Sequence, residues 1–165
     1  MPGKPRRSYE MGHRPRFLAV VDDTPECSRA VRFAARRAGR VGADLVLLAV
    51  IAPPQSQEWL GVGDLLQAEA EGEARAELET AADVARAVAG IEPILVVRTG
   101  ARSDQILALI EEDEDMALLV LAASPGGEGP GPLVSHLAGK ASGQFPVPIA
   151  IVPGQLQDAE IDALA

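Results

Sequence analysis

Two short segments of the sequence hold the residues best suited to ligand chemistry. The first, Asp22-Asp23-Thr24, follows an apolar run and supplies two carboxylates and a hydroxyl. The second, SPGGEGPGPLVSH over residues 124–136, is rich in glycine and leads into a segment with helical spacing. Because glycine lets successive backbone amides converge on one point, such a loop can hold an anion such as a phosphate. The glycines that favour phosphate binding are Gly126, Gly127, Gly129 and Gly131.

The same loop carries features that disfavour an anion. Pro125, Pro130 and Pro132 have no N–H group to donate, and a glutamate among them adds a like charge. No Lys or Arg lies between Arg102 and Lys140. Since a charge-assisted hydrogen bond contributes roughly 1.5 to 3 kcal/mol, losing two or three donors lowers affinity by orders of magnitude. The loop sequence therefore leaves tight ATP binding, weaker or altered ligand binding, and a rigid loop without ligand all open.

Several better-known sites are excluded by residues that the sequence lacks. The first apolar run leads into VVDDTPE, without the glycines of a dinucleotide-binding G-x-G-x-x-G. The pair Gly139-Lys140 has Val134 where a Walker loop needs its upstream glycine. Arg98-Thr99 stands where a phosphorylation receiver would need a further aspartate. Two histidines and one cysteine give no metal-ligand cluster, and no triad-like spacing is present, so we expect no enzyme activity.

Five short apolar runs must position these segments. They span residues 17–21, 45–51, 93–97, 117–122 and 147–152. Each is rich in Val, Leu, Ile and Ala without polar alternation, which is typical of parallel strands buried on both faces. The segments between them place apolar residues at offsets of three, four and seven, which predicts helices. The predicted order is βαβαβαβαβ.

Local signals mark the ends of the predicted helices. Thr24-Pro25 and Ser103-Asp104 predict the starts of the first and third helices, because a hydroxyl can accept an otherwise unpaired amide. Gly39 and Gly90 predict the ends of the first and second helices, since glycine tolerates a positive φ.

The predicted fold is of the α/β class, a doubly wound open parallel five-stranded sheet with helices on both faces. We expect a flexible basic arm over residues 1–15, an α/β domain over 16–154 and a C-terminal tail over 155–165. Ligands of such sheets bind beyond the carboxyl ends of the strands, where the strand order reverses. The turn at residues 22–24 and the loop at 123–132 should therefore meet.

Composition and charge indicate the class of protein. A hydrophobic share of 47% with 3% aromatic residues predicts an aliphatic core, of which the single cysteine, Cys27, is expected to be part. The net charge of −9 disfavours nucleic acid. No apolar run reaches the roughly 18 residues of a membrane helix, and the first sixteen residues lack a secretory signal. We expect a cytoplasmic protein that binds neither nucleic acid nor membranes.

The order and spacing of these segments resemble the universal stress protein family over about residues 16–153. The resemblance is carried by FLAVVDDTPECSRAVRFAARRA, LVLLAVI, RTGARSDQILALIEE and PVPIAIVPG. It implies the strand order 3-2-1-4-5, a homodimer formed through the last strand, and no established catalytic reaction. The last run is very apolar and contains Pro148, which suits an edge strand, so a partner covering it is physically reasonable.

The resemblance also implies a nucleotide site. In the nucleotide-binding branch, the residues ending the first two strands hold adenosine, and a G-x2-G-x9-G-(S/T) segment holds the phosphates. The residues that the resemblance implies for adenosine are Asp22 and Val50. Those that it implies for the phosphates are Ala123, Gly126, Gly127, Gly129, Ser135 and His136. Because Ser135-His136 replaces the closing Gly-(S/T), the motif is incomplete. The implied ligand is ATP or another adenine nucleotide, with Mg²⁺ only if ATP binds.

These observations predict a non-catalytic regulatory or stress-response protein with a degraded nucleotide-binding loop. Two alternatives stay open. One is a slow metal-dependent nucleotide hydrolase, with Asp22 or Asp23 holding magnesium and His136 near the phosphates. The other is an interaction module with a vestigial pocket, which would contact its partner through Trp59 and the basic arm.

Overall fold

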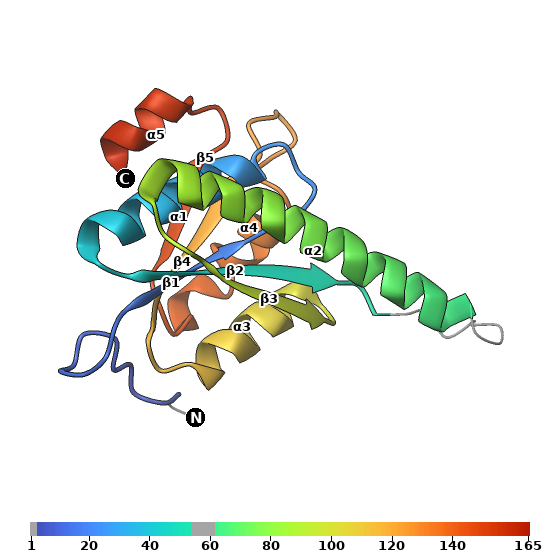
Figure 1. Cartoon of the computed structure of the whole chain (residues 1–165), viewed down its shortest axis with the longest axis horizontal. Helices are drawn as coiled ribbons and strands as arrows, with labels where there is room; N and C mark the ends of the chain where they lie inside the picture. Colours follow the sequence, from blue (N-terminus) through green and yellow to red (C-terminus); the bar gives the residue numbers. More distant parts are fainter. Residues whose placement is uncertain (1–2, 54–61) are drawn as a thin grey trace.

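The computed structural model describes residues 3–53 and 62–165 (Figure 1). Five strands form one parallel sheet in the order β3-β2-β1-β4-β5. Their bounds are β1 (Arg16–Val20), β2 (Asp44–Ile51), β3 (Ile94–Thr99), β4 (Met116–Ala123) and β5 (Ile149–Pro153). The predicted fold class and strand order are both confirmed. Trp59, which the sequence analysis considers as a partner contact, lies outside the described residues.

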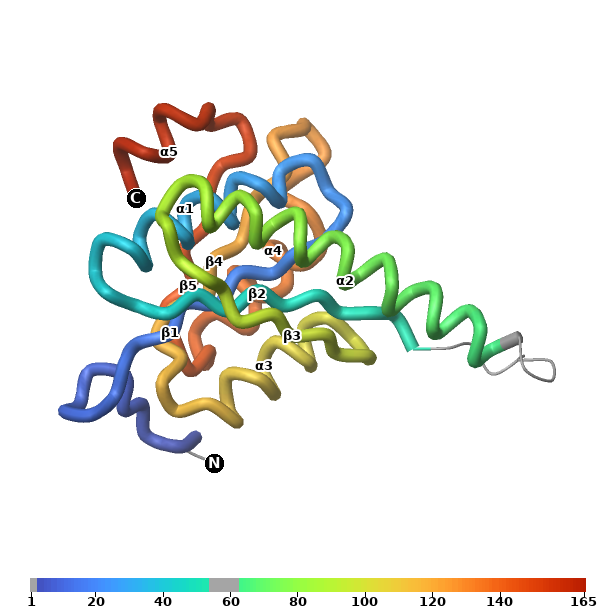
Figure 2. Tube along the Cα trace, viewed as in Figure 1, coloured from blue at the N-terminus to red at the C-terminus, as the bar shows by residue number. Residues whose placement is uncertain are grey.

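Helices cover both faces of the sheet, as Figures 1 and 2 show. The helices are α1 (Cys27–Val41), α2 (Val62–Ala89), α3 (Arg102–Glu112), α4 (Pro132–Leu137) and α5 (Asp158–Leu164), with a 3-10 turn, η1 (Ser142–Gln144), after α4. α1, α2 and α5 share one apolar core, and α3 and α4 share the other. No helix of the described residues is long and apolar enough to cross a membrane.

Successive residues of the central strands enter opposite cores. In β1, Phe17 and Ala19 pack beneath α1, while Leu18 and Val20 pack against α3 and α4. Both faces of each central strand are therefore buried, and this is why the sequence of these strands shows no alternation of apolar and polar residues. Four of the six buried residues of α1 are alanine, whose small side chain allows a helix to pack closely on a sheet.

Two helix starts differ from the sequence prediction. α1 begins at Cys27, and the Thr24 hydroxyl donates a hydrogen bond to the Asp22 carboxylate instead of capping the helix. The Thr24 backbone N–H donates to the same carboxylate oxygen, so residues 22–24 form an Asx-type turn, and the helix starts after it with Glu26 as its N-cap. α3 begins at Arg102, so Ser103 lies inside its first turn. The N-cap is Ala101, whose methyl group cannot accept a hydrogen bond from the helix.

One of the two predicted glycine stops is also wrong. α1 passes through Gly39 and ends at Val41, with Gly42, which has a φ of 74°, as its C-cap. A Cβ at Gly39 would lie 3.3 Å from the Cβ of Ala89 at the end of α2, so this glycine allows the two helices to approach. The stop at Gly90 is confirmed, since α2 ends at Ala89 and Gly90 has a φ of 64°.

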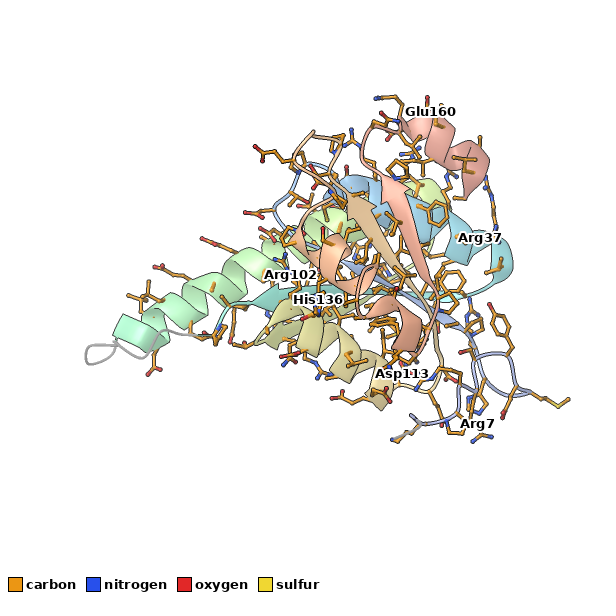
Figure 3. All side chains as sticks on the ribbon, turned by 180° about the vertical axis from the view of Figure 1, so that it is seen from behind. Arg7, Arg37, Arg102, Asp113, His136 and Glu160 are labelled. Carbon is orange, nitrogen blue, oxygen red and sulfur yellow. The ribbon has the colours of Figure 1, made fainter. Side chains whose placement is uncertain are left out.

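The basic N-terminal segment packs against the body of the protein. The Arg6 guanidinium donates to the carbonyl oxygens of Ile110 and Asp113 at 2.7 and 2.9 Å, and His13 Nδ1 lies 2.7 Å from an Asp115 carboxylate oxygen. The side chains at this end include Arg7 and Asp113, both labelled in Figure 3. Residues 3–15, which the sequence analysis expects to form a flexible basic arm, lie against the domain in this structure. Their cations meet the carbonyl end of α3 and the acidic turn after it.

The C-terminal segment is a docked helix rather than a plain tail. Ile161 of α5 is fully buried, and the Asp162 carboxylate accepts hydrogen bonds from Arg32 and Arg36 of α1 at 2.7 to 3.2 Å. These two guanidinium groups hold the pKa of Asp162 well below its usual range. A capping box at Gln157 begins the helix. α5 thus fixes the chain that leaves β5.

Candidate functional site

Two cavities open side by side at the carboxyl ends of the central strands. The first, named here the loop cavity, has a volume of about 130 Å³ and lies between the turn after β1, the end of β4 and residues 130–134. The second, the helix cavity, has a volume of about 220 Å³ and lies between the ends of β1 and β2 and the helix α2. The turn after β1 and the loop after β4 thus face one cavity, as the doubly wound topology predicts.

Asp22 and Arg102 line both cavities. Asp22 is held in place by Thr24, whose backbone N–H and hydroxyl donate to one carboxylate oxygen at 3.0 and 2.5 Å. The other oxygen lies 3.7 Å from an Arg102 guanidinium nitrogen. With its side chain 16% exposed, Asp22 presents a fixed, partly desolvated acceptor at the junction of the two cavities.

Arg102 is a residue of both cavity walls that the sequence analysis misses. It is the first residue of α3, its side chain is 40% exposed, and it is labelled near the centre of Figure 3. Among the described residues that line the two cavities, it carries the only positive charge. A signal was present, because Arg102 follows the carboxyl end of β3 and therefore reaches the edge of the sheet where ligands bind.

The other charged side chains of the lining are all carboxylates. They come from Asp22, Asp23, Glu26, Glu73 and Glu77. Burial raises the pKa of Glu77, and the negative charges of Asp23, Asp22 and Glu73 raise it further, while Arg102 acts in the opposite sense. The site as a whole is therefore acidic, with one cation in it.

The predicted site residues fall into two groups. Asp22 lines both cavities, and Val50, at the end of β2, lines the helix cavity. The other six are not in the wall of either cavity. Gly126, Gly127 and Gly129 lie in an exposed part of the loop, Ser135 and His136 are exposed on α4, and Ala123 ends β4. The loop cavity is instead lined by Gly131, which has a φ of 103°, and its neighbours.

The loop after β4 is closed by its own backbone. Ser124 N–H donates to the Pro130 carbonyl at 3.0 Å, and Gly126 N–H lies 3.4 Å from the Ser124 hydroxyl. At the base of the loop, Gly154 N–H donates to the Ala123 carbonyl at 2.8 Å. The amide of Gly126 is thus directed back to the loop rather than left free for a ligand.

Cys27 lies beneath Asp22 in the wall of the loop cavity. The backbone N–H of Asp22 lies 3.4 Å from the Cys27 Sγ, and the thiol donates to the Val20 carbonyl at 3.6 Å. Burial raises the pKa of this thiol to about 11. Cys27 is therefore a neutral core residue at neutral pH, and its role is to support the turn that carries Asp22.

Residues 3–53 and 62–165 contain no group of three or more His, Cys, Asp or Glu side chains arranged to hold a metal ion. The chemistry on offer is recognition: an apolar strand end at Val50, a fixed carboxylate that can accept hydrogen bonds from hydroxyl groups, and one guanidinium that can contact an anion.

Comparisons with known proteins agree with this geometry. A model described as the Universal stress protein family matches residues 13–153. Among solved structures, the universal stress protein UspA from Lactobacillus plantarum matches with a TM-score of 0.68 and 16% identity, covering 84% of this chain and 97% of that one. The comparison with curated protein sequences finds no match.

Two similar structures were solved with nucleotides. A universal stress protein in complex with cAMP matches with a TM-score of 0.62 and 22% identity, covering 84% of this chain and 96% of that one. The universal stress protein from Archaeoglobus fulgidus in complex with dAMP matches with a TM-score of 0.57 and 19% identity, covering 86% and 99%. These matches show that the fold is shared.

Proposed function

Because the chain belongs to the universal stress protein family, we propose that it is a non-catalytic cytoplasmic regulator that binds an adenine nucleotide at the carboxyl edge of its sheet. The observation that carries this proposal is the position of Asp22, fixed by Thr24 at the junction of two cavities. The similar structures that hold cAMP and dAMP support the choice of ligand class.

In this proposal the base and the sugar occupy the helix cavity and its junction with the loop cavity. The adenine ring packs beside Ala49, Val50 and Ile51, which form the wall at the end of β2. The Asp22 carboxylate accepts hydrogen bonds from the ribose hydroxyls through the oxygen that Thr24 does not use. The Asp22 carboxylate thus sets the orientation of the nucleoside through its ribose, and burial of the adenine ring supplies the apolar part of the binding free energy.

Calorimetry with adenosine tests this function. We expect saturable binding of one adenosine per chain and weaker binding of cytidine, which has the same ribose and a smaller base. Phosphate release from ATP with Mg²⁺ is measured on the same samples and is expected to stay at the buffer background. Absence of adenosine binding would contradict the proposal, and phosphate release that is lost in Asp22→Ala would favour a nucleotide hydrolase instead.

We further propose that the protein is a homodimer formed through β5. Within the part of the chain that the structure describes, β5 pairs only with β4, and Ile151 on it is 41% exposed. An apolar edge strand of this kind is stabilised by a second copy. Light scattering at micromolar concentration should give twice the mass of one chain, and Ile151→Asp should halve it. Leu107→Asp on α3, where the leucine is 40% exposed, is the matched control and should remain dimeric.

A further inference from the structure

Arg102 occupies a position that its helix does not favour. It is the first residue of α3, and a cation at a helix N-terminus opposes the helix dipole. Its contact with the Asp22 carboxylate, at 3.7 Å, is longer than a hydrogen bond. Among the described residues the guanidinium donates no hydrogen bond, so its donors remain available to a ligand.

The surroundings limit how much negative charge a ligand can bring. Arg102 stands alone against the five carboxylates that line the two cavities. One anionic group placed at the guanidinium is matched by its charge and by its forked donors. Each additional phosphate would extend past Arg102 and meet like charge without a further cation to contact.

The loop after β4 does not make up for this shortage. Pro130 and Pro132, in the wall of the loop cavity, have no N–H group, and Gly126, Gly127 and Gly129 lie outside the wall. Glu128 adds another negative charge to the exposed part of the loop.

We infer that Arg102 is the phosphate ligand of this site and that it makes the protein selective for adenine nucleotides with a single phosphate over ATP. The inference rests on the proposed function, because it assumes that the adenosine part lies at Asp22 and Val50. It adds the residue that determines specificity and the number of phosphates that the site accepts.

Calorimetry with adenosine, AMP and ATP in the absence of divalent cations separates the contributions. AMP should bind about fivefold or more tightly than adenosine, because the phosphate gains Arg102. ATP should bind about tenfold or more weakly than AMP, because its outer phosphates meet the carboxylates. In Arg102→Gln the advantage of AMP over adenosine should disappear, while Arg102→Lys should keep part of that advantage.

Arg98→Gln is the matched control. Arg98 lies on β3, only a few residues before Arg102, pairs with Glu112 at 2.6 Å and lines neither cavity, so both affinities should be unaffected. If adenosine binds but AMP is no better, or if ATP equals AMP, the inference about Arg102 is wrong and the proposed function stands. If Arg102→Gln weakens adenosine and AMP equally, Arg102 shapes the site instead of contacting a phosphate. If adenosine does not bind at all, the function and the inference are both wrong.

Discussion

Replacing Asp22 with alanine is expected to weaken adenosine binding roughly ten- to hundredfold, since a hydrogen bond to a charged group contributes about 1.5 to 3 kcal/mol. The carboxylate is already oriented by Thr24, so the wild-type protein does not have to immobilise it when the ligand arrives. The alanine variant loses the acceptor for the ribose hydroxyls. Calorimetric titration of adenosine into both proteins measures the difference.

Two neighbouring substitutions show whether the loss comes from the acceptor or from general disturbance. Asp23 is exposed and lines the helix cavity, but among the described residues its side chain makes no hydrogen bond with Thr24, so Asp23→Ala should change adenosine affinity little. Asp22→Asn keeps an oxygen acceptor without the charge and should give an intermediate affinity. Equal adenosine affinity in Asp22→Ala and the wild type would mean that the ribose is not bound at Asp22.

Gly154→Ala is expected to lower the free energy of unfolding by about 1 to 3 kcal/mol, the usual cost of forcing extra volume into a packed position. A Cβ at this position would overlap the carbonyl oxygen of Ala123 and lie 2.9 Å from Pro125 Cδ and 3.0 Å from Glu26 Cβ. The first of these atoms belongs to the backbone, so a side-chain rotation cannot relieve the overlap. Urea unfolding followed by circular dichroism measures the change.

The same glycine connects stability with the site. Ala123, Pro125 and Glu26 belong to the end of β4, the loop after it and the turn before α1, and a shift of any of them alters the loop cavity. We therefore expect Gly154→Ala to weaken AMP binding as well. Gly143→Ala is the control, because no atom lies within 4 Å of its added Cβ and the unfolding free energy should change by no more than about 0.5 kcal/mol. Equal stability of the two variants would contradict this account of Gly154.

Much of the fold could be predicted from local sequence patterns. The five apolar runs became the five strands, with bounds that moved by at most two residues. The pattern succeeds because a strand buried on both faces needs apolar residues at successive positions, and such a run can be recognised in the sequence of that segment alone. The order of the strands did not follow from the pattern and came from the family resemblance.

Local signals failed where the use of a residue depends on a neighbouring group. Thr24 was expected to cap α1, but it lies in the turn that orients Asp22, to which its hydroxyl donates, and the helix starts after that turn. Gly39 was expected to stop α1, but it permits contact with Ala89 on another helix. In both cases the residue type was informative, and its use depended on a neighbour that the local spacing did not reveal.

The amino-acid sequence by itself determined the elements, the parallel sheet and the carboxyl edge at which Asp22 and Val50 stand. Only the tertiary structure decided that Arg102 lines the two cavities with Asp22, while Gly126 and His136 lie outside their walls. It also decided that Arg6 binds the end of α3 and that Asp162 binds α1. The physical reason is one of range. Hydrophobic periodicity acts between residues a few positions apart, whereas a charge or a cavity wall acts across space, between side chains that only the packing of helices on the sheet brings together.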